Sequence, residues 1–286
     1  MNQLFFNMHI MWYESHMISE TLDSLQIAIE NSPLPVRLTF CLNTQTYIET
    51  PVDGDPVDMF AAFLDHPIMQ RTEEVLYRTN DDPFYNIGDW RRQMYDDLYK
   101  YTIWGESDCL VPPDYFYILS LLDIDEPHVV SLASRKMGDN SWAPVEMVGL
   151  DRFPRSWPER TPQIPQPFHA HDRIGYEELC QINDNGGITI VREERPKIDG
   201  ALLALSPGLP QLIPDDMHFA REDFCANMVL VKRGIPQYVI KNRIKGHNYR
   251  HPDKRRNTDS SRSDDTYKKY ESESLRAMQN FLQTIN

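Results

Sequence analysis

The chain is organised around residues 101–116, YTIWGESDCLVPPDYF, where an apolar strand pattern breaks into acidic residues and then into a proline turn. Residues 101–104 predict a short buried strand, and Pro112-Pro113-Asp114 marks the turn into the next helix. Glu106 and Asp108 stand between them. Carboxylates at the end of a buried strand provide the oxygen ligands that a divalent cation prefers when it also grips a diphosphate. Taken alone, an acid-x-acid pair is too common to identify a metal site.

The segments before this stretch alternate between strand and helix patterns. The predicted order is a strand at 5–13, a helix at 19–29 and a second strand at 36–42. Such a β-α-β unit has a right-handed connection, and its ligand sites lie beyond the carboxyl ends of the strands. Tyr13, Glu14 and Asn43 follow those strand ends and are therefore candidate binding residues.

The alternation continues beyond this unit and is interrupted once. Prolines crowd residues 144–167, so we expect an irregular insertion over 138–173. Apolar residues return at helical spacing after residue 266, which predicts an amphipathic C-terminal helix. We therefore expect one α/β domain over 1–250, and a basic and polar linker with that helix over 251–286. The other predicted elements are helices at 56–64, 87–99, 115–122, 174–183 and 219–231, and strands at 74–78, 129–134, 187–191, 201–205 and 237–240.

Composition excludes several classes of protein. The chain of 286 residues is 41% hydrophobic and has no apolar run long enough to cross a membrane, so we expect a cytoplasmic protein. Its four cysteines are scattered without metal-ligand spacing, which favours free thiols over disulfides or zinc. The net charge is −14, yet residues 231–256 hold nine basic residues against one acidic residue, a net +8, leaving −22 on the rest. That segment is either a solvated basic edge or an anion-binding edge.

The order of these motifs resembles that of the GT-A glycosyltransferases, especially the family 2 type that uses nucleotide-diphosphate sugars. In that family an opening strand ends in a Tyr-Asn-like pair before a helix, as Tyr13-Glu14 precede ETLDSL at 20–25. A second strand ends in the residue that holds the nucleobase, which Asn43 matches. A helix start of the Gly-x-x-x-Arg type, NIGDWRR at 86–92, then leads into an Asp-x-Asp motif, here Glu106-Ser107-Asp108.

Two later landmarks of the family also have counterparts. Glu222-Asp223 open a predicted helix, and His247 lies beyond the following predicted strand. The resemblance runs along most of the chain and implies a mixed, mostly parallel sheet flanked by helices. It implies Asp223 as general base with Glu222 as fallback, and Mn²⁺ or Mg²⁺ held by Glu106, Asp108 and His247. It implies a nucleotide-sugar site formed by Tyr13, Glu14, Asn43, Arg91, Arg92 and Glu106.

The implied reaction is displacement of a nucleoside diphosphate, UDP in the favoured case, by an acceptor hydroxyl with inversion at the anomeric carbon. Each assignment has a structural alternative. Arg91 and Arg92 could pair with nearby aspartates, Glu222 and Asp223 could only favour a helix N-terminus, and His247 could be an exposed residue of the basic edge. The sequence departs from the family pattern in the Glu that begins the metal motif, in Asn43 where Asp is commoner, and in the 138–173 insertion.

The acceptor stays open at this stage. A basic edge on an acidic body suits an anionic polymer, and the compact chain is similar to phage-encoded sugar transferases that modify hydroxymethylcytosine in DNA, which would work in the host cytoplasm. Lys245, Arg250, Arg255 and Arg256 are the candidate acceptor contacts. A saccharide or protein acceptor, a nucleotidyltransferase and a non-catalytic nucleotide-sugar-binding module are the alternatives. The sequence leaves the sugar and the oligomeric state undetermined.

Overall fold

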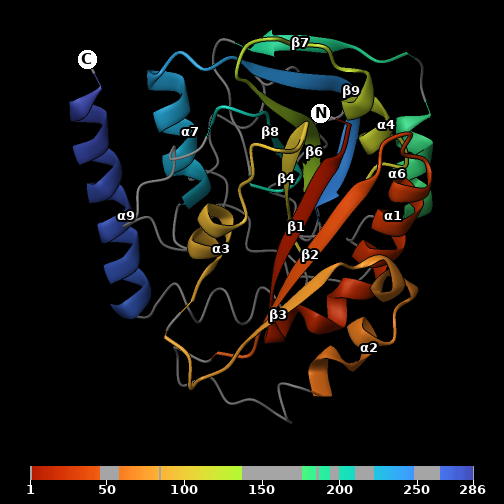
Figure 1. Cartoon of the computed structure of the whole chain (residues 1–286), viewed down its shortest axis with the longest axis horizontal. Coiled ribbons are helices and arrows are strands. Elements are labelled where there is room, and N and C mark those ends of the chain that lie inside the picture. Colours follow the sequence, from red (N-terminus) through yellow and green to blue (C-terminus); the bar gives the residue numbers. More distant parts are fainter. Residues whose placement is uncertain are drawn as a thin grey trace, which may run out of the picture.

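The structure is a computed structural model that describes residues 2–45, 58–83, 85–136, 176–184, 187–193, 200–209, 222–247 and 265–285. The described residues form one sheet of nine strands with helices packed against it (Figure 1). The strands are β1 (Leu4–Met11), β2 (Val36–Asn43), β3 (Glu74–Arg78), β4 (Tyr101–Gly105), β5 (Cys109–Leu110), β6 (Val129–Lys136), β7 (Ile190–Glu193), β8 (Leu203–Leu205) and β9 (Gln237–His247).

The sheet has a parallel half and a mixed half. Its order is β3-β2-β1-β4-β8-β6-β9-β5, with β7 paired to β9. The first four strands are parallel, in a register that places Phe6 opposite both Leu38 and Ile103. β8 is antiparallel to β4 and to β6, whereas β6 and β9 are parallel to each other. β6 and β9 therefore run in the same direction as β1, β2 and β4.

Two groups of helices cover the sheet. They are α1 (Ile18–Glu30), α2 (Ala61–Leu64), α4 (Tyr115–Leu121) and α6 (Tyr176–Asn183) on one side of Figure 1, and α3 (Ile87–Gln93), α7 (Glu222–Lys232) and α9 (Asp265–Thr284) on the other. The described connections between strands and helices include short 3-10 helices: η1 (Trp12–Met17), η2 (Asp58–Phe60) and η3 (Pro67–Arg71).

Helices of the two groups contribute to separate apolar cores. α1 packs Leu22 and Leu25 with β1, β2 and α4 in the larger core, while α7 and α9 form a second core with Trp104 and Leu205. A sheet with both faces covered needs strands that are apolar along their whole length. β1, LFFNMHIM, is apolar except for Asn7 and His9, and every one of its residues before Met11 is buried.

β9 is longer than the sequence pattern predicts. The strand expected at 237–240 continues to His247, because the ladder with β6 resumes after an irregularity. Leu132 pairs with Ile240, but Ala133 pairs with Ile244, so residues 241–243 form an extra loop in β9. A bulge of this kind redirects side chains without ending the strand.

The predicted fold class is confirmed: the chain has a mixed, mostly parallel α/β sheet flanked by helices, with a C-terminal helix that packs on the body. The insertion predicted at 138–173 lies outside the described residues. The division into a 1–250 domain and a 251–286 tail stays a prediction. Among the described helices none is long and apolar enough to cross a membrane.

Candidate active site

Four strands bring their carboxyl ends to one edge of the sheet. β1, β2 and β4 are parallel, and β9 runs in the same direction, so Met11, Asn43, Gly105 and His247 end at this edge. The carboxyl edge of an α/β sheet is where ligands bind in this class of fold. Six of the residues singled out in the sequence end these strands or follow them within three residues: Tyr13, Glu14, Asn43, Glu106, Asp108 and His247.

The acidic motif forms a turn that is tied to α1. Thr21 Oγ1, from α1, donates to the Ser107 carbonyl at 2.7 Å, and the Cys109 amide donates to the Glu106 carbonyl at 3.2 Å. Asp108 is buried. The chain then forms β5, which the sequence pattern did not predict, and in the β5–β9 ladder Cys109 lies opposite His247. Residues 106–108 and the backbone of His247 are thus neighbours, although the side chain of His247 lies outside the described ones.

Arg91 is bound into the same motif. Its guanidinium, on α3, donates to Glu106 Oε1 at 3.0 Å and to the Gly200 carbonyl at 3.2 Å, and lies 5.0 Å from the centre of the Trp104 ring. A Cβ atom at Gly200 would overlap this guanidinium. The buried Arg91 therefore fixes the carboxylate of Glu106 relative to both α3 and the segment before β8.

Arg92 has a different environment. It pairs with Asp89 one turn earlier in α3, and Asp89 also belongs to the capping box with Asn86 that begins this helix. Asn86 Oδ1 accepts from the Asp89 amide at 3.1 Å. Arg92 is therefore paired with a nearby aspartate, as the alternative to a binding role expected, whereas Arg91 reaches the acidic motif.

Asn43 is fully engaged within the protein. Its Nδ2 donates to His9 Nε2 at 3.0 Å and to the Tyr85 carbonyl at 2.7 Å, and its Oδ1 accepts from the Gln45 amide at 2.8 Å. Burial, followed by the positive charges of Arg91 and Arg78, lowers the pKa of His9 to about 3. A neutral His9 can accept the bond from Asn43. A nucleobase contact by Asn43 stays a prediction, and these bonds show what it does in the protein itself.

Glu14 closes the first turn after β1. Its Oε2 accepts from the Met11 amide at 3.1 Å, and the side chain is buried. It therefore acts as a cap for η1. Tyr13 belongs to the same short helix, and its side chain lies outside the described ones.

The candidate base lies at the start of α7. Asp223 is partly exposed, and its Oδ1 accepts from the Phe224 amide at 2.7 Å. Figure 1 shows the end of α7 leading through a short loop into the start of β9, so the first turn of α7 lies away from that end of β9. The backbone of Glu222 belongs to this turn, whereas its side chain is not among those described.

The candidate acceptor residues do not form one described surface. Lys245 is buried and its Nζ donates to the Ala201 carbonyl. Arg250, Arg255 and Arg256 lie outside the described residues. A role for these four residues in binding an acceptor stays a prediction, and the structure gives Lys245 a bond to the segment before β8.

Sequence reasoning missed four contributors to this edge: His9, Tyr85, Gln45 and Gly200. His9 stands inside an apolar strand, and a polar residue in such a run is a signal that a buried partner exists. Gln45 Nε2 and Oε1 bind the backbone around the 79–85 loop, including the Tyr85 amide at 2.8 Å. No pattern marks Gly200, because its importance depends on the approach of Arg91 from a helix 109 residues away.

The donor set at this edge fits a hard divalent cation. Among the described side chains, no group of three His, Cys, Asp or Glu residues could by itself hold a metal ion. Glu106 and Asp108 nevertheless provide carboxylate oxygens separated by one residue, and the register places the backbone of His247 opposite Cys109. Carboxylates with an additional imidazole suit Mn²⁺ or Mg²⁺ that keeps phosphate or water ligands.

No protein-family profile and no curated protein sequence matches this chain. Solved structures do. GalNAc-T7, in a crystal structure with UDP, GalNAc and Mn²⁺, is 12% identical, with 99% of this chain and 56% of that chain covered and a TM-score of 0.51. S. aureus TarS 1-349, in a complex with UDP-GlcNAc, is 10% identical over 86% of this chain and 57% of that chain, with a TM-score of 0.47.

This chain therefore spans just over half of the length of those two proteins. At such identities the likeness concerns the fold alone. The match to GalNAc-T7 extends over nearly the whole chain. The chain has the mixed α/β fold of the GT-A glycosyltransferases.

Proposed function

We propose that this protein transfers a sugar from a nucleotide-diphosphate sugar, a UDP-sugar in the favoured case, to an acceptor hydroxyl. The observation that carries the proposal is the β5–β9 register, which pairs Cys109, the residue after the acidic motif, with His247 at the carboxyl edge of the sheet. Asp108, the last residue of the acidic motif, and His247 are 139 positions apart in the sequence. GalNAc-T7, whose fold is similar, was solved with UDP and Mn²⁺, which agrees with this choice of donor and cation.

The donor half of the site is formed by the acidic motif and its support. Glu106, Asp108 and His247 would hold Mn²⁺ or Mg²⁺, which when bound supplies positive charge against the diphosphate that leaves. Arg91 keeps the Glu106 carboxylate in place through the 3.0 Å ion pair. Because this pair is preformed, little reorganisation is needed when the charged donor binds.

Asp223 is the proposed general base. A bond forms between the acceptor oxygen and the anomeric carbon while the bond from that carbon to the diphosphate oxygen breaks. The hydroxyl proton goes to the Asp223 carboxylate, and attack opposite the leaving group inverts the anomeric centre. Asp223 is partly exposed at the start of α7, so an acceptor can reach it from solvent.

The test combines binding with turnover. UDP-GlcNAc and UDP-GalNAc, each with and without Mn²⁺, should raise the melting temperature of the wild-type chain, and UDP should be released in the presence of acceptors. Asp108→Asn should lose the Mn²⁺-dependent part of the shift, and Asp223→Asn should keep the shift but lose transfer. Asp125→Asn, at an exposed aspartate outside the site, is the matched control.

The outcomes separate the rival functions. Donor binding without UDP release for any acceptor would indicate a binding module, and pyrophosphate release from a nucleoside triphosphate would indicate a nucleotidyltransferase. Wild-type turnover in both Asp108→Asn and Asp223→Asn would overturn the assignment of the site.

The acceptor is proposed to be a saccharide, a protein side chain or hydroxymethylcytosine in DNA. A DNA acceptor would require phosphate contacts, so its binding should weaken steeply with salt. Arg255→Gln with Arg256→Gln should then flatten that salt dependence by about two phosphate contacts. Transfer to a neutral saccharide at a rate independent of salt would exclude DNA as the required acceptor.

A further inference from the structure

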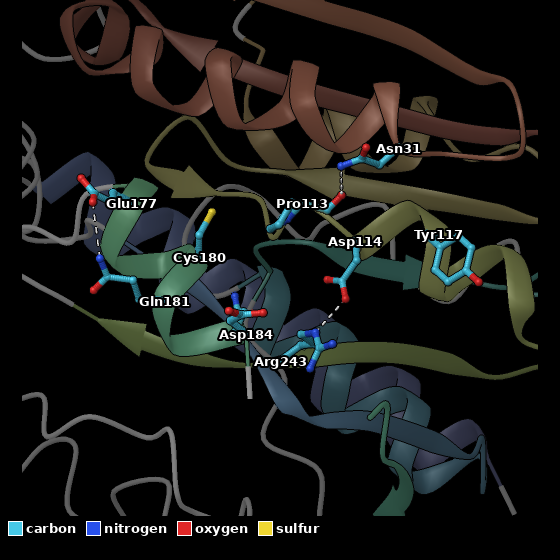
Figure 2. A pocket seen from close by; sticks show the side chains of 10 residues that line it. Asn31, Pro113, Asp114, Tyr117, Glu177, Cys180, Gln181, Asp184 and Arg243 are labelled. Atoms are coloured by element: carbon cyan, nitrogen blue, oxygen red, sulfur yellow. Dashed lines mark hydrogen bonds and ion pairs between the residues drawn. The ribbon is translucent and has the colours of Figure 1, made fainter. Parts of the chain in front are cut away.

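A groove of about 650 Å³ lies away from the carboxyl edge of the sheet. It is bordered by the residue after α1, the start of α4, the exposed side of α6 and the irregular part of β9 (Figure 2). α1 begins after the carboxyl end of β1 and ends just before the start of β2. The last turn of α1, and the groove beside it, therefore lie toward the edge of the sheet opposite the carboxyl edge. The residues that carry the argument are Asn31, Asp114, Tyr117, Gln181, Asp184 and Arg243.

The floor of the groove depends on the bulge in β9. Residues 241–243 have no register partner in β6, and Arg243 leaves the ladder to meet Asp114. Arg243 Nε donates to Asp114 Oδ2 at 2.7 Å, with side chains that are 11% and 30% exposed. Asp114 Oδ1 is a buried acceptor with no hydrogen-bond partner among the described residues. A buried acceptor without a protein donor is expected to accept a hydrogen bond from a ligand or a water molecule.

The walls of the groove are held rigidly. Asn183 fixes α6 to β9 by two bonds, Nδ2 to the Ile244 carbonyl at 2.9 Å and Oδ1 from the Ile244 amide at 2.8 Å. On the opposite wall Asn31 Nδ2 donates to the Pro113 carbonyl at 3.1 Å. Figure 2 shows Gln181 of α6 and Asp184, which follows this helix, on one side and Tyr117 of α4 on the other. The two walls are therefore attached to β9 and to the segment before α4 before any ligand arrives.

The chemistry of the lining selects one class of ligand. Carboxylate, amide and guanidinium groups can each bind a pair of neighbouring hydroxyls, and the Tyr117 ring, on a residue that is 43% exposed, offers an apolar face beside them. Asp114, Glu177 and Asp184 outnumber Arg243 by two negative charges, which disfavours phosphates and other anions. We propose that this groove is a second carbohydrate-binding site, for a neutral saccharide.

This proposal does not rest on the transferase activity, so the two can fail separately. The binding experiment uses the full chain without nucleotide or metal, and the probes are cellotriose, maltotriose and chitotriose at up to about 10 mM. Saturation-transfer NMR detects contact, and calorimetry gives the dissociation constant. At least one of these neutral trisaccharides should bind, and adding UDP with Mn²⁺ should not displace it.

Two variants test whether the saccharide binds in this groove, and a third variant serves as a control. Tyr117→Ala should weaken binding about fivefold through the lost ring contact. Gln181→Ala, at the exposed wall of α6, should weaken it about threefold through the lost hydrogen bonds. Tyr77→Ala removes another exposed tyrosine, on β3, and should bind as the wild type does. The proposal is overturned if none of the probes binds, if UDP displaces them, or if Tyr117→Ala and Gln181→Ala both bind with wild-type affinity.

Discussion

Arg91→Met should destabilise the protein by about 3 kcal/mol, because it removes the partner of a largely buried carboxylate. Removing one member of a buried ion pair costs about 3 to 5 kcal/mol, since the remaining charge loses its compensation. The Arg91 side chain is 1% exposed and that of Glu106 is 18% exposed. Water can therefore reach Glu106 in part, which places the expected loss at the lower end. Methionine keeps apolar contact with Trp104, so little of the loss comes from packing.

The assay is urea unfolding of the wild type, Arg91→Met, Glu106→Gln and the double variant at 25 °C. If the ion pair is what stabilises the motif, the double variant should lose at least about 1.5 kcal/mol less than the sum of the single losses. Gly200→Ala is an independent check, because its Cβ would displace the Arg91 guanidinium without changing any charge. Single losses below about 1 kcal/mol that simply add would refute the structural role of the pair.

Two further predictions concern pH and packing. The folded-state pKa of His9 is lowered to about 3 from 6.5. As pH falls, the unfolded chain therefore takes up the proton first, and the stability of the folded state decreases. Between pH 7 and pH 5 the loss of stability from His9 should be about 2 kcal/mol. His9→Gln should show a correspondingly smaller loss in urea unfolding at the two pH values, and an unchanged pH dependence would contradict the assignment. Gly105→Ala should cost about 2 kcal/mol, because the new Cβ would collide with the ring of Phe6. Gly187→Ala, where nothing lies within 4 Å of the new Cβ, should change the urea midpoint little. Equal changes in the midpoint for Gly105→Ala and Gly187→Ala would contradict the predicted collision with Phe6.

Strands were predicted well where a continuous apolar run ends at a turn. β3 has the predicted limits, and β2 extends one residue beyond them to Asn43. The acidic motif likewise follows a buried strand, as expected. These features depend on local composition, since a strand covered on both faces needs apolar residues throughout.

Helix limits and faces were predicted less well. The helix expected at 87–99 ends at Gln93, and Asp96 Oδ1 instead accepts from the Leu98 amide at 2.8 Å in the following turn. In α7, Phe224, Met228 and Val231 lie at helical spacing, which indicates a shared apolar face, yet these residues are exposed. α7 packs its smaller residues, such as Cys225 and Ala226, in the core that it shares with α9. Spacing shows that a helix has an apolar stripe, but the partner decides which stripe is buried.

The limit of β9 shows a related difficulty. The polar residues Lys241-Asn242-Arg243 end the local strand pattern, whereas pairing with β6 resumes at Ile244 and carries the strand to His247. Local sequence gives no sign of this resumption, because the neighbouring strand supplies it from more than 100 residues away. The position of His247 beside the acidic motif follows from that pairing.

The sequence by itself determined the class of fold and the order in which polar residues follow its buried strands, because both depend on short-range patterns of apolar and polar residues. Only the tertiary structure decided which of those polar residues already have partners. Asn43 is engaged by His9 and Gln45, Arg91 by Glu106 and Gly200, and Lys245 by Ala201. The long-range bonds among these, such as that between Arg91 and Gly200, form only when strand register and helix packing bring distant segments together, so the sequence motifs could not reveal them.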